Sequence, residues 1–464
     1  MLPWLAREIL YPLQERALGR PTFAYLRELE ASQWLDRAGI EALQARKLNF
    51  LLADALVHCP WHAERLRAAG LEGAVRKGEV TLKDLTRMPT MTKADARAHV
   101  DAIAWHAVPG GAQRYNTGGS SGEPLIFYFG RARQASDAAG RMRARRWWGV
   151  APGDREAYLW GAPVELNKTD RVKTFRDRLI NHLVLNAFAM GPRQMDAYID
   201  ALNAWQPVCV YGYASSIALL AAHAERSGRA LRLGKLKVVC TTGESLYPDQ
   251  RELIARVYGA PVANEFGSRD IGFMAHEAPS GQMLFISESH VLEVLDESNN
   301  PVPVGQPGEA VLTGLTSQAQ PFIRYRTGDV VRLSEAPDAG GRGLHVIAEV
   351  VGRHTDFVVA ADGTIMHALA VIYVLRATEG VAQFKCVQHS LRDFEVQVVP
   401  DSAWESDAAA RIACGLKARL GEAVHVDVRC VDHIPAEPSG KHRYVVSHVD
   451  PLNSMSSANG SAAA

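Results

Sequence analysis

Short apolar segments alternate with longer helical patterns in the middle of the chain, and this alternation constrains the fold most. Pro207–Tyr211 predicts a strand, Ser215–Arg226 a helix and Lys235–Cys240 a second strand. Pro248–Tyr258 again has helical spacing, and Pro261–Phe266 again predicts a strand. Strands that alternate with helices build βαβ units, so we predict an α/β fold with mostly parallel sheets flanked by helices.

The remaining segments complete the predicted organisation. A large N-terminal domain is expected over residues 1–352, and its leucines at helical spacing predict a helical lead-in over 1–100. Short apolar runs separated by Pro and Gly predict a β-rich subregion over 283–333. Residues 353–450 combine strand and helix patterns and predict a small α+β domain, followed by a disordered tail over 451–464.

The charge balance and the cysteines exclude some classes of function. The 464 residues hold 51 Lys plus Arg and 51 Asp plus Glu, so the formal net charge is zero. Non-specific nucleic-acid binding depends on excess cations that neutralise phosphates, and we therefore expect no nucleic-acid partner. The cysteines are far apart and form no C-x-x-C pair, which argues against a disulfide framework and a zinc cluster.

The N-terminal sequence bears on location. No apolar stretch reaches the roughly 18–20 residues of a spanning helix, and the first 20 residues lack a signal-peptide pattern. We therefore expect a cytoplasmic protein without a transmembrane segment. The first amphipathic helix, which contains Trp4 and Tyr11, is expected to pack on its own domain; contact with a membrane surface is the alternative.

The segment Asn116–Pro124 groups glycines and hydroxyls in one short loop before a predicted strand. Its sequence is Asn-Thr-Gly-Gly-Ser-Ser-Gly-Glu-Pro. Glycine loops let backbone N–H groups approach an anion, and hydroxyls add donors for phosphate oxygens. The loop is not a Walker motif, since it lacks Gly-Lys-Ser/Thr and no helix opens from it. It predicts a phosphate site, with a flexible hairpin connection as the alternative.

Five further turns carry groups suited to nucleotide chemistry. Thr241–Leu246 follows a predicted strand, at the end where open α/β sheets bind ligands. Asn264–Gly272 offers an aromatic ring for a base and a carboxylate for a divalent cation. Tyr325–Asp329 ends in a carboxylate that can accept hydrogen bonds from a ribose diol. Gly352–Asp356 follows, and Pro438–Lys441 then places a lysine on a glycine loop that can swing into a site.

In this order, the six motifs resemble those of the adenylate-forming superfamily of acyl-CoA and aryl-CoA ligases. The resemblance is greatest to the phenylacetate–CoA ligase-like branch with its capsular-polysaccharide-type members, and it covers about residues 40–446. It implies ATP and Mg²⁺ as cofactors, a small-molecule carboxylic acid as substrate and CoA as co-substrate. It also implies that the small C-terminal domain is a mobile lid.

The resemblance implies a role for individual residues. The ATP phosphates would be bound by Thr117, Gly119, Ser120, Ser121 and Gly122. The nucleotide and the substrate side would be lined by Gly243, Glu244, Ser245, Asn264, Glu265, Phe266, Gly267 and Ser268, with Phe266 packed on adenine. Asp270 would hold Mg²⁺, Asp329 would bind the ribose hydroxyls and Arg353 would assist it. Lys441 would bridge the attacking carboxylate and the α-phosphate.

The implied reaction is physically consistent with these groups. A carboxylate that attacks a phosphate brings anions together, so the transition state needs a metal ion and a cation placed in advance. We therefore expect an ATP-dependent ligase that activates a carboxylic acid as an acyl-adenylate, releases pyrophosphate and transfers the acyl group to CoA. One alternative is acyl or adenylyl transfer to an amine or hydroxyl acceptor in polysaccharide or natural-product biosynthesis. Another is a non-catalytic binding protein.

Three positions depart from the commonest family pattern. Glu123 stands where a lysine is usual, and Arg269 stands where a hydroxyl residue is usual. Asp270 is one methylene shorter than the usual glutamate but can still ligate Mg²⁺. Glu123 and Arg269 support the non-catalytic alternative.

Other residues also attract attention. The acid pocket is expected to be lined by Trp160, Tyr211, Gly212 and Tyr213, at predicted strand ends, with core packing as an equal alternative. The arginines of 141–146 beside Trp147 predict a solvated basic face next to a core-facing ring, with an acceptor pocket as the alternative. His276 and Glu277 are expected to make local hydrogen bonds rather than to bind a metal. The sequence does not give the oligomeric state, and a homodimer is left open.

Overall fold

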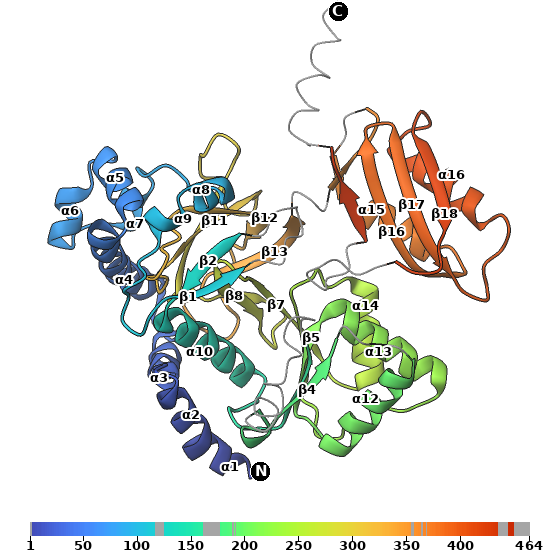
Figure 1. Cartoon of the computed structure of the whole chain (residues 1–464), viewed down its shortest axis with the longest axis horizontal. Helices are drawn as coiled ribbons and strands as arrows, with labels where there is room; N and C mark the ends of the chain where they lie inside the picture. The colour runs from blue at the N-terminus through green and yellow to red at the C-terminus, as the bar shows by residue number, and fades with distance from the viewer. Residues whose placement is uncertain are drawn as a thin grey trace, which may run out of the picture. The chain divides into compact units, whose positions relative to one another are not determined.

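The chain divides into an N-terminal unit, residues 1–351, and a C-terminal unit, residues 352–464 (Figure 1). The computed structural model describes residues 2–116, 125–160, 177–187, 190, 192–353, 357–362, 365–367, 369–434 and 444–449. Each unit has a sheet of its own covered by helices, and the predicted α/β class is confirmed. No helix in these ranges is long and apolar enough to cross a membrane.

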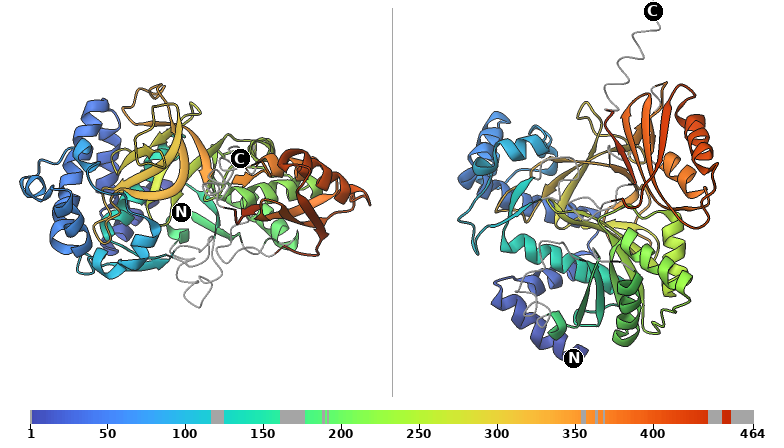
Figure 2. Two further views of the ribbon diagram at one scale, coloured as in Figure 1. Left: turned by 90° about the horizontal axis from the view of Figure 1, so that it is seen from above. Right: turned by 45° about the vertical axis from the view of Figure 1, so that its right-hand side comes forward.

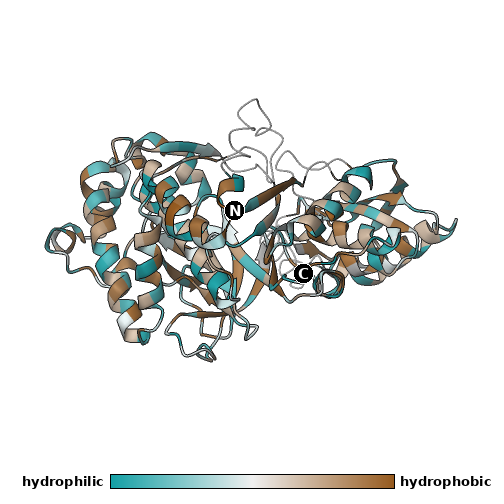
Figure 3. Cartoon of the chain, turned by 90° about the horizontal axis from the view of Figure 1, so that it is seen from below, coloured by the Kyte–Doolittle hydropathy of each residue, from teal (hydrophilic) through white to brown (hydrophobic). Residues whose placement is uncertain are grey.

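The first hundred residues are helical, as predicted. Figure 3 shows these helices with hydrophobic and hydrophilic residues intermixed, as expected when one face of a helix packs and the other is exposed. Thr92 is the N-cap of the helix that begins at Lys93, since its side chain and that of Asp95 form a capping box. The elements are α1 (Pro3–Leu5), the π-helical η1 (Ala6–Leu10), α2 (Tyr11–Ala17), α3 (Thr22–Ser32), α4 (Arg37–His58), α5 (Pro60–Ala68), α6 (Glu72–Lys77), α7 (Leu82–Leu85), α8 (Lys93–Ala98) and α9 (Val100–Ile103).

The first helical segment packs on its own unit through one face. Tyr11 meets Phe23 edge to face at a centroid distance of 5.6 Å, and Glu15 is buried where Thr22 donates a hydrogen bond to it. The predicted packing is therefore confirmed for this face. Trp4 and Leu13 are 57% and 55% exposed, so part of the apolar surface of this segment is uncovered by the described part of the chain.

An eleven-stranded sheet forms the centre of the N-terminal unit, in the order β10-β11-β12-β13-β9-β8-β7-β6-β5-β3-β4. Its parallel part holds β3 (Glu156–Trp160), β4 (His182–Asn186), β5 (Cys209–Tyr213), β6 (Val238–Thr242) and β7 (Val262–Ser268). The antiparallel part holds β8 (Gly272–Glu277), β9 (Met283–Phe285), β10 (His290–Leu295), β11 (Pro307–Gly314), β12 (Tyr325–Leu333) and β13 (Val346–Arg353), and it includes the predicted β-rich subregion. A separate antiparallel pair is formed by β1 (Gln113–Asn116) and β2 (Ile126–Phe129).

The two faces of the parallel part differ in chemistry. Paired residues of neighbouring strands point to the same side, so the partners Val210 and Val239 share one face while Tyr211 and Cys240 share the other. The first face is apolar and packs against α12 (Pro192–Trp205), α13 (Ala214–Ser227) and α14 (Pro248–Tyr258). α10 (Arg131–Trp147) covers the second face, and the views place it opposite α12–α14 across β4 and β5 (Figure 1 and Figure 2).

Charged side chains of α10 point into the N-terminal unit, which corrects one prediction. Arg143 and Arg145 were expected on a solvated face, but they are buried and pair with Glu288 and Glu156 respectively. The side chains of the first pair are 1% and 0% exposed. A buried guanidinium stays charged when a carboxylate compensates its lost hydration, and the partners are too distant in sequence for a local pattern to reveal them.

The C-terminal unit contains a four-stranded sheet in the order β18-β17-β16-β19. Ile412, Leu416 and Leu420 recur every four residues and are buried, so they form the packing face of α16. The elements are β14 (Phe357–Val359), β15 (Ile365–His367), α15 (Leu369–Arg376), β16 (Val381–Ser390), β17 (Asp393–Pro400), α16 (Ala408–Leu420), β18 (His425–Cys430) and β19 (Val445–Ser447).

Candidate functional site

The predicted motif residues of the N-terminal unit gather at the carboxyl ends of parallel strands. β3 ends at Trp160, β5 at Tyr213 and β6 at Thr242, while Phe266 lies near the end of β7. Open α/β sheets bind ligands in this position, because the strands end together and their loops are free to vary. The same edge of the sheet therefore brings together residues that are about a hundred positions apart in the chain.

Asp270 joins two of the motifs. Ser268 donates a hydrogen bond to its Oδ1 atom over 2.6 Å, and the Tyr325 hydroxyl donates to its Oδ2 atom over 2.8 Å. Arg133 of α10 donates to the main-chain carbonyls of Asp270 and Arg269, which fixes the turn between β7 and β8. Two side chains thus hold the carboxylate and a third holds the main chain of the turn, and the motif Asn264–Gly272 contacts the motif Tyr325–Asp329 through Tyr325.

The Tyr325–Asp329 motif forms an irregular part of β12. Gly328 has a φ of +75°, a conformation that favours glycine, and its N–H group bonds to Glu309 over 3.1 Å. Thr327 donates from its hydroxyl to the carbonyl of Ala310 over 2.9 Å and accepts from the Asp329 N–H group over 3.1 Å. Asp329 is only 5% exposed, so its carboxylate is held on a rigid strand.

The turn after β6 is built on Gly243, whose φ of +76° again favours glycine. Glu244 directs its carboxylate to the beginning of α13, where its Oε2 atom accepts from the Ser215 N–H group over 2.9 Å. A carboxylate at a helix N-terminus satisfies a free N–H group and interacts favourably with the helix dipole. Glu244 therefore fixes the loop to α13, while the neighbouring Ser245 is exposed.

Aromatic rings and a buried carboxylate lie next to each other at the strand ends. Trp160 stacks on Tyr213 with a centroid distance of 4.4 Å and an interplanar angle of 14°. Tyr211 donates from its hydroxyl to Glu265 over 2.9 Å. Burial, and next the charge of Glu265, raise the pKa of the Tyr211 hydroxyl, so this group stays protonated and donates.

Two residues of this cluster were missed as site residues. Thr242 donates to Glu265 over 3.1 Å, and Arg141 forms an ion pair with it at 3.3 Å. The sequence placed Arg141 in a basic face because nothing near it in the chain announces an acidic partner. The sequence signal for this cluster was Glu265 itself, an acidic residue within the predicted strand Pro261–Phe266.

The other predicted site residues of this unit lie in contacts between neighbouring strands. Asn264 donates its N–H group to Glu277 over 2.9 Å. A side chain at Gly267 would meet the carbonyl of Gly272 at 2.8 Å, so the two strands require glycine there. Gly212 faces the carbonyl of Leu159 in the same way and lies on the face away from Tyr211.

Several predicted residues lie beyond what can be placed. Thr117, Gly119, Ser120, Ser121, Gly122, Glu123 and Lys441 fall outside the described residues. Arg353 ends β13, and only its backbone is described. The strands that flank the glycine-hydroxyl loop do pair, since Asn116 lies opposite Ile126 across β1 and β2.

His276 makes the predicted local contact. It is buried in β8, and its Nδ1 atom lies 2.9 Å from the carbonyl oxygen of Glu277. The Glu277 carboxylate is in turn bound by Arg251 over 2.8 Å. Within the described ranges, no group of three or more His, Cys, Asp and Glu residues is arranged to hold a metal ion.

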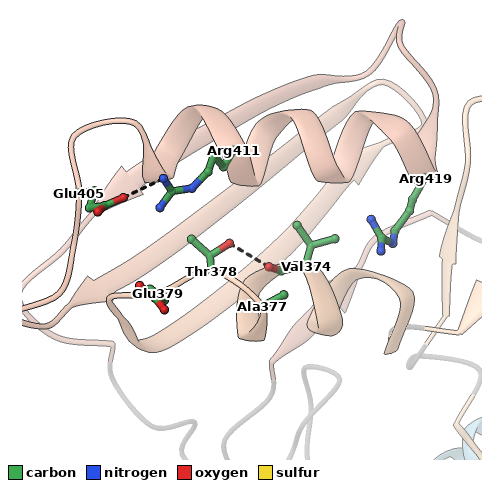
Figure 4. Close-up of a pocket in the computed structure, with 7 residues that line it drawn as sticks. All are labelled: Val374, Ala377, Thr378, Glu379, Glu405, Arg411 and Arg419. Carbon is green, nitrogen blue, oxygen red and sulfur yellow. Dashed lines mark hydrogen bonds and ion pairs between the residues drawn. The ribbon is translucent and has the colours of Figure 1, made fainter.

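A separate pocket lies between α15 and α16 of the C-terminal unit (Figure 4). Arg411 on its rim pairs with Glu405 at 2.8 Å and with Asp407 at 2.7 Å, and Thr378 donates to the Val374 carbonyl over 3.0 Å. None of the predicted site residues lines this pocket. Arg411 and Glu405 already pair with each other, so the strand ends of the N-terminal unit remain the candidate site.

Comparison with known proteins shows that the chain is similar to ligases over most of its length. A crystal structure of 2-hydroxyisobutyryl-CoA ligase in the postadenylation state is similar with a TM-score of 0.70 and 21% identity, over 93% of this chain and 94% of that chain. Phenylacetate-coenzyme A ligase of Thermus thermophilus is 24% identical over 458 residues, which cover 91% of this chain and 99% of the relative. Over most of its length the chain is thus similar to ligases of the adenylate-forming superfamily, which agrees with the resemblance of its motifs.

The C-terminal unit indicates the branch more closely. Residues 358–448 match the family model of the CapK C-terminal domain. Protein CapK of Staphylococcus aureus is 23% identical over 393 residues, which cover 84% of this chain and 85% of CapK. The resemblance to the phenylacetate–CoA ligase-like branch, with its capsular-polysaccharide-type members, is therefore confirmed.

Proposed function

We propose that the protein is an ATP-dependent ligase that activates a carboxylic acid as an acyl-adenylate, releases pyrophosphate and transfers the acyl group to CoA. The contact between Asp270 and Tyr325 carries this proposal, because it joins two nucleotide motifs at the carboxyl ends of the strands. The names of the similar ligases support CoA as the acceptor.

The nucleotide would lie across these strand ends. Phe266 is half-buried and offers a ring surface to adenine, and Asp329 offers a fixed carboxylate to the ribose hydroxyls. The hydroxyl-rich loop between β1 and β2, from Thr117 to Gly122, would donate to the phosphates. Arg353 would assist Asp329, and Lys441 would bring its ammonium group to the acid and the α-phosphate.

Asp270 suits the role of a Mg²⁺ ligand. Each of its oxygens accepts one described side-chain hydrogen bond, and a carboxylate oxygen has two lone pairs, so both can also face a cation. Bound Mg²⁺ would neutralise charge on the phosphates during attack by the acid. Ser268 and Tyr325 would hold the carboxylate in place for that contact.

The proposal is tested by pyrophosphate exchange into ATP with a panel of carboxylic acids. Exchange that depends on an acid is the expected result, because acyl-adenylate formation is reversible. Absence of exchange with every acid would favour the non-catalytic binding protein.

A second candidate concerns the acceptor. An amine or hydroxyl acceptor is the alternative to CoA, because the family model that matches residues 358–448 is that of CapK rather than of a CoA ligase. CoA consumption during AMP release, measured with the acid that gives the fastest exchange, separates the two candidates. Rapid AMP release only when CoA is present supports the thioester.

Asp329→Ala is expected to weaken ATP binding by about a hundredfold or more. The change removes a carboxylate that would accept hydrogen bonds from both ribose hydroxyls, and hydrogen bonds to charged groups contribute about 1.5–3 kcal/mol each. Isothermal titration with ATP and Mg²⁺ measures the effect. Asp296→Ala removes an exposed carboxylate in a turn and serves as the control. Equal affinity of the Asp329 variant and the parent would exclude the ribose contact.

A further inference from the structure

The sheet face under α10 is unusually polar for the interior of a parallel sheet. Parallel strands covered on both sides are normally apolar on both faces. Here one face packs against α12–α14 in an apolar core, whereas the other carries Tyr158, Tyr211, Thr242 and Glu265. These polar groups gather at the carboxyl ends of the strands, where a ligand is expected.

Glu265 is the most constrained group on this face. Its side chain is 2% exposed, and its Oε1 atom is shared by three donors, from Tyr211, Thr242 and Arg141. Its Oε2 atom is buried and accepts no hydrogen bond from any residue in the described ranges. A buried acceptor that lacks a donor costs about 1–3 kcal/mol, and more when it is charged. The described donors therefore all bind Oε1, and Oε2 is available to a donor group of a ligand.

The charge of Glu265 is already balanced. Arg141 lies 3.3 Å from Oε1, and its guanidinium is placed over the ring of Phe273 at 5.2 Å from the centroid. A ligand at Oε2 therefore has no need to bring a full positive charge. A hydroxyl or an amino group suffices, because either can donate one hydrogen bond to a carboxylate.

The aromatic rings of the same face border this carboxylate. Tyr211 contacts Glu265 through its hydroxyl and lies 5.7 Å from Trp160 between ring centroids. Trp160 and Tyr213 stack on each other and present flat apolar surfaces. An apolar wall next to one unsatisfied acceptor fits a ligand with an apolar body and a single donor group.

We infer that the organic part of the acid is recognised here, and that the substrate class is carboxylic acids carrying a hydroxyl or amino group that donates to Glu265 Oε2. Carboxylic acids of the same shape that lack such a donor group are expected to be poor substrates. The inference rests on the proposed function, since it assigns the acid to the site at which adenylation would occur.

The test compares matched acids in pyrophosphate exchange. Phenylacetate is paired with the 2-, 3- and 4-hydroxy and amino phenylacetates, and isobutyrate is paired with 2-hydroxyisobutyrate. The parent protein is expected to favour the best donor-bearing acid of a pair by about tenfold to a hundredfold in kcat/KM, the range for one hydrogen bond to a charged group. Glu265→Gln should reduce that preference to near unity, because the amide keeps one acceptor oxygen and replaces the other with a donor.

Glu288→Gln is the matched control, since it weakens another buried arginine pair, with Arg143, without touching the strand ends. It should retain the parent's preference. A parent that prefers plain acids overturns the inference while leaving the proposed function intact, as does a Glu265→Gln variant with unchanged preference. Exchange with no acid at all overturns both. Should Glu265→Gln fail to fold, the parent's preference among matched acids decides.

Discussion

Lys441→Ala is expected to lower the rate of acyl-adenylate formation by at least 10²–10³-fold while leaving the fold intact. The reaction brings a carboxylate to a phosphate, and a cation held in advance between the two is the kind of preorganised group whose loss has this effect. Pyrophosphate exchange measures the rate, and thermal unfolding checks the fold. Lys417→Ala makes the same change of charge on α16 and should retain the parental rate.

The two half-reactions should respond differently to Lys441→Ala. Attack of CoA on a supplied acyl-adenylate has no pyrophosphate to form, so that step should keep most of its rate. Exchange at the parental rate in the variant would exclude the role of Lys441. Equal loss of both steps would indicate a structural effect instead.

Glu288→Ala is expected to destabilise the N-terminal unit by about 3–5 kcal/mol. The change leaves Arg143 charged and buried without its carboxylate, and removing one partner of a buried pair has an effect of this size. Urea unfolding followed by tryptophan fluorescence measures it, because eight of the nine tryptophans precede residue 352.

Two variants show whether burial is the cause. Glu72→Ala breaks the ion pair between Glu72 and Arg76, in which the two side chains are 33% and 63% exposed. This variant should change the free energy of unfolding by less than about 1 kcal/mol. The double change Arg143→Met with Glu288→Leu should recover much of the lost stability, because no buried charge remains. Similar losses in Glu72→Ala and Glu288→Ala would contradict the explanation.

The sequence predicts the elements well where one periodicity persists. The helix predicted at Pro248–Tyr258 has these limits in the structure, because Pro248 begins it and Gly259 ends it in a left-handed conformation. The strand predicted at Lys235–Cys240 instead runs from Val238 to Thr242. The prediction ended at Cys240 because the run of apolar residues ends there, whereas the buried Thr241 and Thr242 continue the strand toward the candidate site.

The candidate site is predictable only in part. The motifs predict Asp270 and Tyr325–Asp329 individually as candidate site residues, because each type of residue suits a step of nucleotide chemistry. Their contact depends on pairing across 55 positions, which no local pattern encodes. The pairing of Arg141 with Glu265 is hidden for the same reason, since it joins a helix and a strand 124 positions apart.

The ion pair between the buried Glu265 and Arg141, whose side chain is 35% exposed, limits how this site can diverge. An apolar residue at Glu265 alone would leave the guanidinium without its counter-ion, and one at Arg141 alone would leave the carboxylate uncompensated. A descendant or an engineered variant that accepts purely hydrocarbon acids therefore has to exchange both residues together. A route that changes Arg141 first passes through an intermediate with a buried, uncompensated carboxylate, which is less stable than either end.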